Sequence, residues 1–328
     1  MDFKNRKLIV GVGSALVDIL AQEEDAFLSA AGAAKGGMTL VEASEIDRLI
    51  ELTTGANAVV PGGSACNTVI GVGDLGGQAR FIGKRGKDSL GMAYEKDLIA
   101  HGVEPEMLES DDPTGRVLSV VTPDAQRTMF TYLGAAASMT PDEISPECFR
   151  DAAIVHVEGY LLFNRELMDA VLKAAKAQGA KISLDLASFN VVEESKDLLD
   201  LIVAEYIDIL IANEDEALAF TGERDEAKAL GILAKDVEMA VLKIGARGSL
   251  ISGNGEVVVI KGMGNGVAVD TTGAGDLWAS GFLFGLVNGM SLEQSGALGS
   301  CCGYEVCQLI GAKISDDGWH RIKETIVM

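Results

Sequence analysis

Residues 270–276 read Asp-Thr-Thr-Gly-Ala-Gly-Asp, and the apolar run that follows predicts the first turns of a buried helix. Gly273, Ala274 and Gly275 would place consecutive backbone N–H groups at the N-terminus of that helix, where free donors and the helix dipole attract an anion. Asp276 stands in the same turn and could accept a proton from an alcohol. A phosphate cradle beside a carboxylate indicates phosphoryl transfer. Taken alone, the segment also fits an ordinary loop-to-helix junction.

A second glycine-rich motif, Pro-Gly-Gly-Ser-Ala-Cys-Asn-Thr, lies at residues 61–68 ahead of a helical run. Gly62 and Gly63 would let the backbone approach a ligand closely, and Asn67 can both donate to and accept from a hydroxyl. By itself this motif is as consistent with a helix cap as with a sugar site.

The composition restricts the partners that this chain could have. Its 328 residues are 48% apolar and include 39 glycines, which fits a well-buried α/β enzyme. Asp and Glu number 49 against 27 Lys and Arg, a net charge of −22, so nucleic acids and anionic membranes should be repelled. No apolar run reaches the ~18 residues of a membrane span. An anionic substrate would have to be held by backbone amides, a metal ion and a few cations.

The cysteine pattern indicates a reducing compartment. The five cysteines are odd in number and form no Cys-X-X-Cys pair, so we expect buried thiols and a cytoplasmic location. They are Cys66, Cys148, Cys301, Cys302 and Cys307. The three histidines lie far apart and near no cysteine pair, which argues against structural zinc.

Short runs rich in Val, Ile and Leu alternate with helical stretches, which predicts βαβ units on a mainly parallel sheet. We expect strands at Leu8–Val12, Ala79–Gly83, Ile154–Val157, Ile182–Asp185, Ile209–Ala212, Ala240–Ile244, Ser249–Ser252 and Val257–Ile260. We expect helices at Cys66–Leu75, Met92–His101, Arg165–Gln178, Glu214–Thr221, Arg224–Ala234, Leu277–Asn288, Leu292–Cys307 and Trp319–Ile326. No linker interrupts this alternation, so residues 1–328 are expected to form a single domain.

Two segments break the alternation. Residues 114–133 contain two β-rich runs around the turn Pro123-Asp124-Ala125, a pattern typical of a hairpin. Residues 19–41 are a second irregular stretch. Together these segments could form a small sheet beside the main one, and a small sheet over a cleft is a natural lid.

Two familiar nucleotide-binding motifs are incomplete here. Gly11, Gly13 and Leu16 occupy the positions of a G-X-G-X-X-G fingerprint, but the third glycine is missing, which argues against a dinucleotide site. Gln78 and Arg85 replace residues that a Walker phosphate loop requires around Gly83 and Lys84. A nucleoside triphosphate would therefore be bound without a Walker motif.

With the motifs at 62–67 and 270–276, the chain resembles the PfkB, or ribokinase-like, kinase family. Further matches follow in the family's order, at residues 11–18 (GVGSALVD), 81–88 (FIGKRGKD), 114–117 (TGRV), 213–216 (NEDE) and 241–248 (VLKIGARG). Each match is weak singly, but the ordered set is specific and spans nearly the whole chain. The resemblance implies a three-layer α/β/α fold with a mainly parallel central sheet, a small β lid and ATP-dependent phosphorylation of an alcohol.

The resemblance also implies roles for individual residues around the reacting groups. Asp276 matches the family's catalytic base, and Gly273, Ala274 and Gly275 match, with it, the anion hole for the moving phosphoryl group. The positions that hold the acceptor hydroxyls are matched by Asp18, Gly62, Gly63 and Asn67.

Arg127, on the expected hairpin, is similar to a lid arginine that contacts phosphate in related kinases. Without the resemblance, Arg127 could be a solvated charge on an edge strand. In the same way, Asp18 could be a turn residue at the end of a strand.

For metal ions, Asn213 and Glu216 match the N-X-X-E motif that organises magnesium, through water. By itself Glu216 could equally be a solvated helix residue. The loop at Asp270 and Thr272 resembles a potassium site of some relatives.

On the nucleotide side, Lys243, Gly245 and Gly248 match the family's strand and turn, although many members have Thr where Lys243 stands. Asn213 and Thr271 are further candidates for nucleotide binding.

Among family branches, the chain is most similar to the adenosine kinases, in its long segment 18–62 and in residues 127–136 (RTMFTYLGAA). Phe130 and Tyr132 alternate on the expected hairpin and so share one face, where an aromatic ring could stack on a base; core packing explains the pair equally well.

The function we predict is an ATP- and magnesium-dependent kinase that acts on the primary hydroxyl of a nucleoside, converting adenosine to AMP. One alternative is a sugar kinase acting on ribose, fructose or a 2-keto-3-deoxy sugar acid. A catalytically silent binding protein would require loss of Asp276 or of the anion hole, and neither is lost. The sequence leaves monomer and homodimer open.

Overall fold

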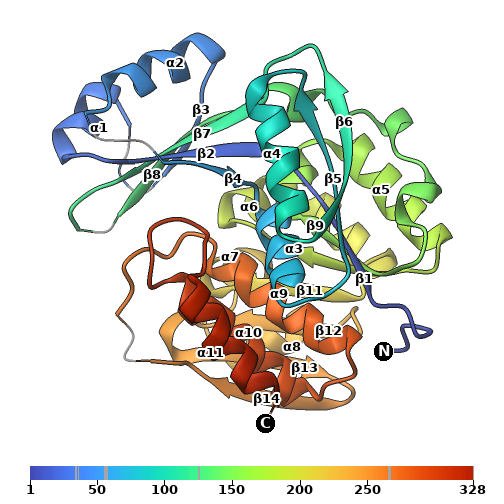
Figure 1. The fold of residues 1–328 in the computed structure, drawn as a ribbon. Helices are drawn as coiled ribbons and strands as arrows, with labels where there is room; N and C mark the ends of the chain where they lie inside the picture. The colour runs from blue at the N-terminus through green and yellow to red at the C-terminus, as the bar shows by residue number, and fades with distance from the viewer. Residues whose placement is uncertain (34, 36, 55–57, 125, 265–266, 328) are drawn as a thin grey trace.

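The computed structural model describes residues 1–328 except residues 34, 36, 55–57, 125, 265–266 and 328. A nine-stranded sheet crosses the molecule in the order β14-β13-β12-β11-β10-β9-β1-β5-β6. From β6 to β12 neighbouring strands are parallel, and β13 runs antiparallel to both β12 and β14. Helices cover both faces (Figure 1). The predicted α/β/α fold with a mainly parallel sheet is therefore confirmed.

Each face of this sheet has its own helical layer. Buried side chains of α5, α6, α7 and α8 pack on one face, and those of α3, α4, α9 and α10 pack on the other. The strands are β1 (Leu8–Val12), β5 (Ala79–Gly86), β6 (Val103–Ser110), β9 (Ala152–Glu158), β10 (Lys181–Asp185), β11 (Ile209–Asn213), β12 (Met239–Lys243), β13 (Gly248–Gly253) and β14 (Glu256–Lys261). The helices are α3 (Ser64–Asp74), α4 (Ser89–Ala100), α5 (Arg165–Ala177), α6 (Phe189–Glu205), α7 (Glu214–Thr221), α8 (Glu226–Leu233), α9 (Ala274–Val287), α10 (Leu292–Val306) and α11 (Asp316–Val327), the last packed on α10.

Every strand and helix predicted for the main sheet is present, with ends that differ by a few residues. Two elements were not predicted. Strand β6 contains Pro105 and several glutamates, which are typical of a loop, but an edge strand tolerates proline and charge. Helix α6 begins after the N-cap Ser188, whose hydroxyl accepts from the Val191 N–H, and its buried residues recur at helical spacing.

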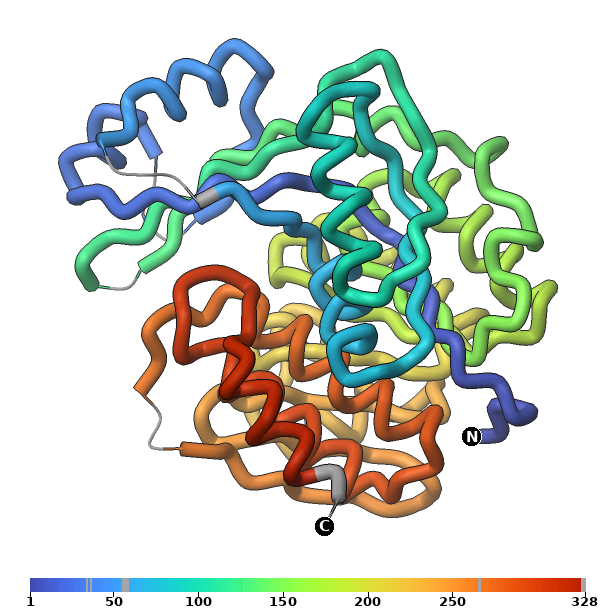
Figure 2. The backbone as a smooth tube through the Cα atoms, in the orientation of Figure 1, coloured from blue at the N-terminus to red at the C-terminus, as the bar shows by residue number. Residues whose placement is uncertain are grey.

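A second sheet of five strands lies beside the first, in the order β3-β8-β7-β2-β4. Its strands are β2 (Leu16–Gln22), β3 (Met38–Leu40), β4 (Ala58–Gly62), β7 (Gly115–Val121) and β8 (Arg127–Tyr132). Helices α1 (Asp25–Ala31) and α2 (Ala43–Leu52) cover one face of it. The chain enters this sheet from β1 and returns through β4 into α3 (Figure 2).

The predicted hairpin at 114–133 corresponds to β7 and β8, which pair antiparallel. The turn residue Ala125, and residues 34 and 36 within the segment 19–41, lie outside the described residues. The second sheet also uses β4 and α2, which lie beyond the predicted boundaries of the lid. Its extent was therefore underestimated, because β4 is short and its residues showed no clear strand pattern.

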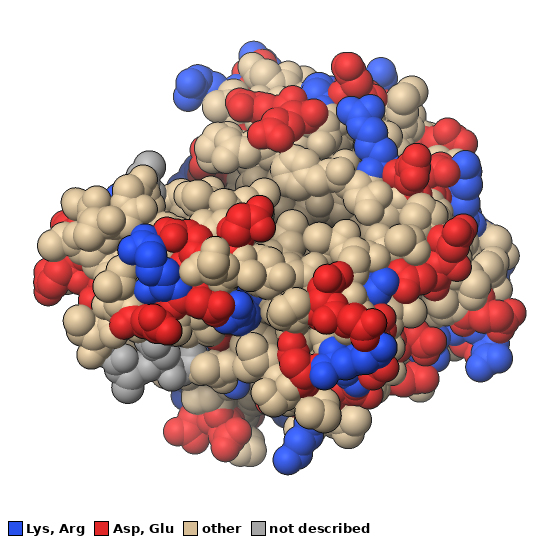
Figure 3. Space-filling view, turned by 90° about the horizontal axis from the view of Figure 1, so that it is seen from above, with Lys and Arg blue, Asp and Glu red and all other residues tan. Residues whose placement is uncertain are grey.

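The surface keeps the acidic character of the composition. On the face seen in Figure 3, Lys and Arg stand singly or in small groups among Asp and Glu. Within the described ranges, no helix has both the length and the apolar content needed to cross a bilayer.

Candidate active site

A cavity of about 770 Å³ lies between the two sheets, at the carboxyl ends of the parallel strands. Open α/β sheets bind their ligands at this edge. The second sheet contributes residues of β2, β3, β7 and β8, and α9 contributes its first turn. The main sheet contributes the last residues of β9, β10, β11 and β12, which are Glu158, Asp185, Asn213 and Lys243.

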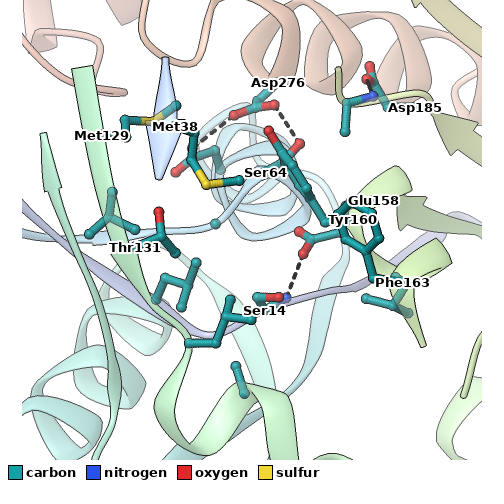
Figure 4. A pocket seen from close by; sticks show the side chains of 18 of the residues that line it. Ser14, Met38, Ser64, Met129, Thr131, Glu158, Tyr160, Phe163, Asp185 and Asp276 are labelled. Carbon is teal, nitrogen blue, oxygen red and sulfur yellow. Dashed lines mark hydrogen bonds between the residues drawn. The ribbon is translucent and has the colours of Figure 1, made fainter. Parts of the chain in front are cut away.

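Asp276 joins the two glycine-rich motifs inside this cavity. Its carboxylate accepts hydrogen bonds from Ser64 Oγ at 2.7 Å and from Asn67 Nδ2 at 2.9 Å (Figure 4). Burial raises the pKa of Asp276, and the hydrogen bonds from Asn67 and Ser64 partly offset this effect. A partly buried carboxylate with two fixed donors is oriented to accept a proton from a third group in the cavity.

The N-terminus of α9 has the features of an anion cradle. The N–H groups of Ala274 and Leu277 donate to Thr271 O and Gly273 O, at 3.1 and 2.8 Å. In the described part of the chain, nothing accepts from the N–H of Gly275 or Asp276. These two donors and the helix dipole are therefore available to an anion in the cavity.

The two glycines of the motif at residues 61–68 leave no room for a Cβ unless a neighbour moves. A Cβ on Gly62 would lie 2.6 Å from Cγ of Asp18, so a larger residue would displace that carboxylate. Gly63 has φ +98°, and a Cβ there would overlap the carbonyl oxygen of Ser14. Asp18, Gly63 and Asn67 line the cavity, whereas Gly62 is absent from its described lining and lies against the Asp18 carboxylate. Their role in binding the acceptor stays a prediction.

Asp18 and Arg127 reach this site from the second sheet. Burial raises the pKa of Asp18 to about 6, although the guanidinium of Arg127 favours its charged form. Arg127 on β8 donates to Thr272 Oγ1 in the loop before α9. The Thr272 hydroxyl in turn donates to Asp270 Oδ1 at 2.7 Å, so this chain of contacts links the second sheet to the anion cradle. Potassium binding at this loop stays a prediction.

Asn213 and Glu216 form a capping box at the start of α7. Glu216 accepts from the Asn213 N–H at 2.8 Å and from Nδ2 at 2.6 Å, and its own N–H donates to Asn213 Oδ1. Glu216 is buried, which raises its pKa to about 7, with a further contribution from Asp185. It is therefore not a solvated helix residue.

These oxygen donors suit magnesium, which retains much of its water and takes few protein ligands. In the described residues no group of three or more His, Cys, Asp or Glu is arranged to enclose a metal ion. An ion held through water and phosphate oxygens would fit this arrangement.

The residues expected on the nucleotide side are not all in the cavity. Lys243 and Thr271 line it, whereas Gly245 and Gly248 are absent from its described lining and lie in the turn between β12 and β13. Gly248 has φ +111°, and a Cβ there would overlap Ile260 O. The backbone conformation at this position and the close approach of Ile260 therefore account for a glycine at residue 248.

The cavity also has an apolar part. It is lined by Leu16, Met38, Leu40, Val117, Met129, Leu133, Met139, Leu161 and Phe163. Phe130 does not face this space, because it is buried between the second sheet and α1 and α2, where Tyr132 also packs. Arg127, Met129 and Thr131 are the described β8 residues that line the cavity, and Figure 4 shows Met129 and Thr131 there. The prediction that Phe130 and Tyr132 could stack on a base is therefore wrong, and core packing explains the pair.

Comparison with known proteins identifies the family. The family model described as "pfkB family carbohydrate kinase" matches residues 32–317. The chain belongs to the pfkB family. An adenosine kinase structure from Sinorhizobium meliloti is 33% identical, with a TM-score of 0.89 and coverage of 97% of this chain and 99% of that one. A probable sugar kinase structure from Rhizobium etli is also 33% identical, with a TM-score of 0.91 and coverage of 98% and 99%. A 5-dehydro-2-deoxygluconokinase from Listeria monocytogenes is 30% identical over 79% of this chain and 84% of that protein.

Membership of the pfkB family makes the chain a phosphotransferase that uses ATP and acts on a hydroxyl group of a sugar or nucleoside. The names of its relatives divide between these two acceptor classes. The acceptor must therefore be argued from the cavity.

Three carboxylates in the described lining of the cavity were missed as site residues, which are Glu158, Asp185 and, at the start of α5, Glu166. Glu158 ends β9 with 1% of its surface exposed and accepts from the Ser14 and Ala65 N–H groups at 2.8 and 3.1 Å. Burial raises the pKa of Glu158 to about 7. Asp185 ends β10 and pairs with Lys243. For Glu158 and Asp185 the available signal was an acidic residue at the carboxyl end of a buried parallel strand, where such sheets place their ligands.

Proposed function

We propose that this pfkB family member is a nucleoside kinase that transfers a phosphoryl group from ATP to the primary hydroxyl of adenosine, forming AMP. The apolar side chains that line the cavity support this proposal, since they offer a surface for a purine base. A free sugar presents hydroxyl groups on all sides and has no use for such a surface. Asp276 and its donors Ser64 and Asn67 line the same cavity.

In this proposal Asp276 is the general base. The acceptor lies with its ribose hydroxyls near Asp18 and Asn67 and its primary hydroxyl near the Asp276 carboxylate. As the hydroxyl oxygen attacks the γ-phosphorus of ATP, its proton passes to Asp276, and the bond from this phosphorus to the β,γ-bridging oxygen breaks to release ADP. The N–H groups of Gly275 and Asp276 stabilise the negative charge on the transferred phosphoryl group. Their preorganisation at a helix N-terminus is the observation that supports this role.

Magnesium bound with ATP would neutralise part of the phosphate charge, and Asn213 and Glu216 are the residues that would hold its water shell. These residues end one strand and begin the next helix at the same edge of the sheet as Lys243. We further propose that the second sheet acts as a lid on a single domain, with Arg127 as its contact to the cradle loop.

A sugar kinase is the second candidate, and one observation favours it. Arg165, at the start of α5, lines the cavity and could pair with the carboxylate of a sugar acid. The apolar side chains of the cavity offer the hydroxyl groups of such an acceptor no hydrogen bonds, so we rank it second.

The deciding experiment compares kcat/KM for adenosine, ribose, fructose and a 2-keto-3-deoxy sugar acid under the same ATP and magnesium. Adenosine should exceed the sugars by orders of magnitude, and 3′-deoxyadenosine should be a poor substrate because buried polar groups would be left unpaired. If ribose or fructose is the better substrate, the nucleoside proposal fails while phosphoryl transfer stands.

A matched pair of variants on β3 tests where the base lies. Met38→Asp places a charge in the apolar part of the cavity and should raise KM for adenosine without changing the weak activity on ribose. Thr39→Asp places the same charge on the neighbouring residue, which faces away from the cavity. Equal effects of the two variants would contradict the proposed position of the base.

A further inference from the structure

Lys243, the last residue of β12, forms an ion pair that fixes its ammonium group. Its side chain crosses β11, which lies between β12 and β10, and its Nζ pairs with Asp185 Oδ2 at 2.8 Å. Both side chains are largely buried, with exposed fractions of 13% for Lys243 and 7% for Asp185. The other Asp185 oxygen accepts from the Ala187 N–H at 3.0 Å, which fixes the carboxylate. The ammonium is thus held in one position above the sheet.

That position is against the anion cradle. A Cβ built on Gly275 would lie 2.9 Å from Lys243 Nζ, so the ammonium directly adjoins the backbone whose N–H is free. An ammonium has three N–H donors, and its described hydrogen bond to Asp185 uses one of them. The other N–H groups of this largely buried ammonium need hydrogen-bond acceptors. An anion bound in the cradle would supply such an acceptor.

Lys243 is one of few cations in a cavity whose charged side chains are mostly acidic. Six acidic side chains line the cavity, which are Asp18, Glu158, Glu166, Asp185, Glu216 and Asp276. Its described cations are Arg127, Arg165 and Lys243. Burial disfavours the charged form of Lys243, but the carboxylates of Asp185 and Glu216 outweigh burial and raise its pKa. Asp185 therefore keeps the ammonium both charged and in place.

We propose that Lys243 contacts the phosphoryl group being transferred, beside the N–H groups of Gly275 and Asp276, and that Asp185 is a positioning residue for its ammonium. Lys243 would then add a positive charge where negative charge develops in the transition state. This inference rests on phosphoryl transfer, as proposed above, and does not depend on which acceptor is used.

Calorimetric binding of two nucleotides in the presence of magnesium tests the contact directly. The probes are ADP and the β,γ-methylene analogue of ATP, which differ in the terminal phosphoryl group. Lys243→Met should weaken binding of the analogue by at least ~10-fold and of ADP by less than ~2-fold, because charge-assisted contacts to one phosphate are lost. Turnover should fall by ~10²- to 10³-fold, with KM for the acceptor unchanged. Lys243→Arg should retain part of the preference for the analogue.

Asp185→Asn keeps the ammonium but removes its fixed partner, so kcat should fall by less than in Lys243→Met. Lys261→Met, an exposed lysine on β14, is the matched control and should change neither nucleotide affinity nor turnover. The inference would be overturned if Lys243→Met weakened the binding of ADP and of the analogue equally, or weakened neither. A lysine that only links β12 to β10 through its ion pair with Asp185 would not distinguish the two nucleotides. These binding results stand even if adenosine proves not to be the acceptor.

Discussion

The substitution Asp276→Asn should remove the general base while preserving the site around it. Each carboxylate oxygen accepts one described side-chain hydrogen bond, from Ser64 Oγ at 2.7 Å and Asn67 Nδ2 at 2.9 Å. An asparagine can keep both contacts, because its carbonyl accepts from Asn67 and its amide can donate to the Ser64 hydroxyl, which rotates freely. Folding and acceptor binding should therefore persist. General base catalysis contributes ~10²- to 10⁴-fold, so turnover should fall by that factor, about 3–5 kcal/mol of barrier.

The assay measures initial rates of ADP formation with saturating adenosine, ATP and magnesium, together with the melting temperature. Asp142→Asn, at an exposed carboxylate, is the matched control. Burial raises the pKa of Asp276 and the base must be ionised, so wild-type turnover should decline as the pH falls through this raised pKa. The variant should lack that decline. Turnover within ~10-fold of the wild type, with the acidic decline intact, would refute the assignment.

Three further predictions follow from the same contacts. Glu216→Ala should lower activity most at low magnesium and recover partly as magnesium is raised; an unchanged magnesium dependence would exclude the site. Gly62→Ala should lower kcat/KM for the acceptor by ~10-fold or more, because its Cβ would lie 2.6 Å from Cγ of Asp18. Gly231→Ala, where a Cβ meets nothing within 4 Å, is its control and should have no effect. Burial raises the pKa of Glu158 from 4.5 to about 7. Between these pH values the native state therefore binds more protons than the unfolded state. The free energy of unfolding should fall by up to ~3 kcal/mol as the pH rises from 4.5 to about 7. Urea unfolding at about pH 5 and pH 8 should show a smaller fall for Glu158→Gln, and equal falls would contradict the raised pKa.

The main sheet, its helices and the family motifs could be predicted from the amino-acid sequence. Apolar runs and helical spacing are local patterns, and they sufficed for β1, β9 and β11 because strands buried on both faces are almost uniformly apolar. The edge strand β14 has one exposed face, but it keeps the apolar run Val257–Ile260. Local patterns did not predict the edge strand β6 of the main sheet or all the strands of the second sheet. The edge strand β6 tolerates Pro105, and the short strands of the second sheet acquire their partners only from distant parts of the chain.

The contacts between side chains that are distant in the sequence depend on the packing of the folded chain. Asn67 and Asp276 are 209 positions apart in the chain and share a hydrogen bond, which no local periodicity can indicate. Alternation along β8 shows that Met129 and Phe130 face opposite ways, but the packing of α1 and α2 on one face decides that Phe130 is buried and Met129 lines the cavity. Likewise, Lys243 could be placed at the end of a strand from the sequence. Its contact with Gly275 depends on how α9 and Asp185 are packed around it, because a long side chain takes its position from its partners.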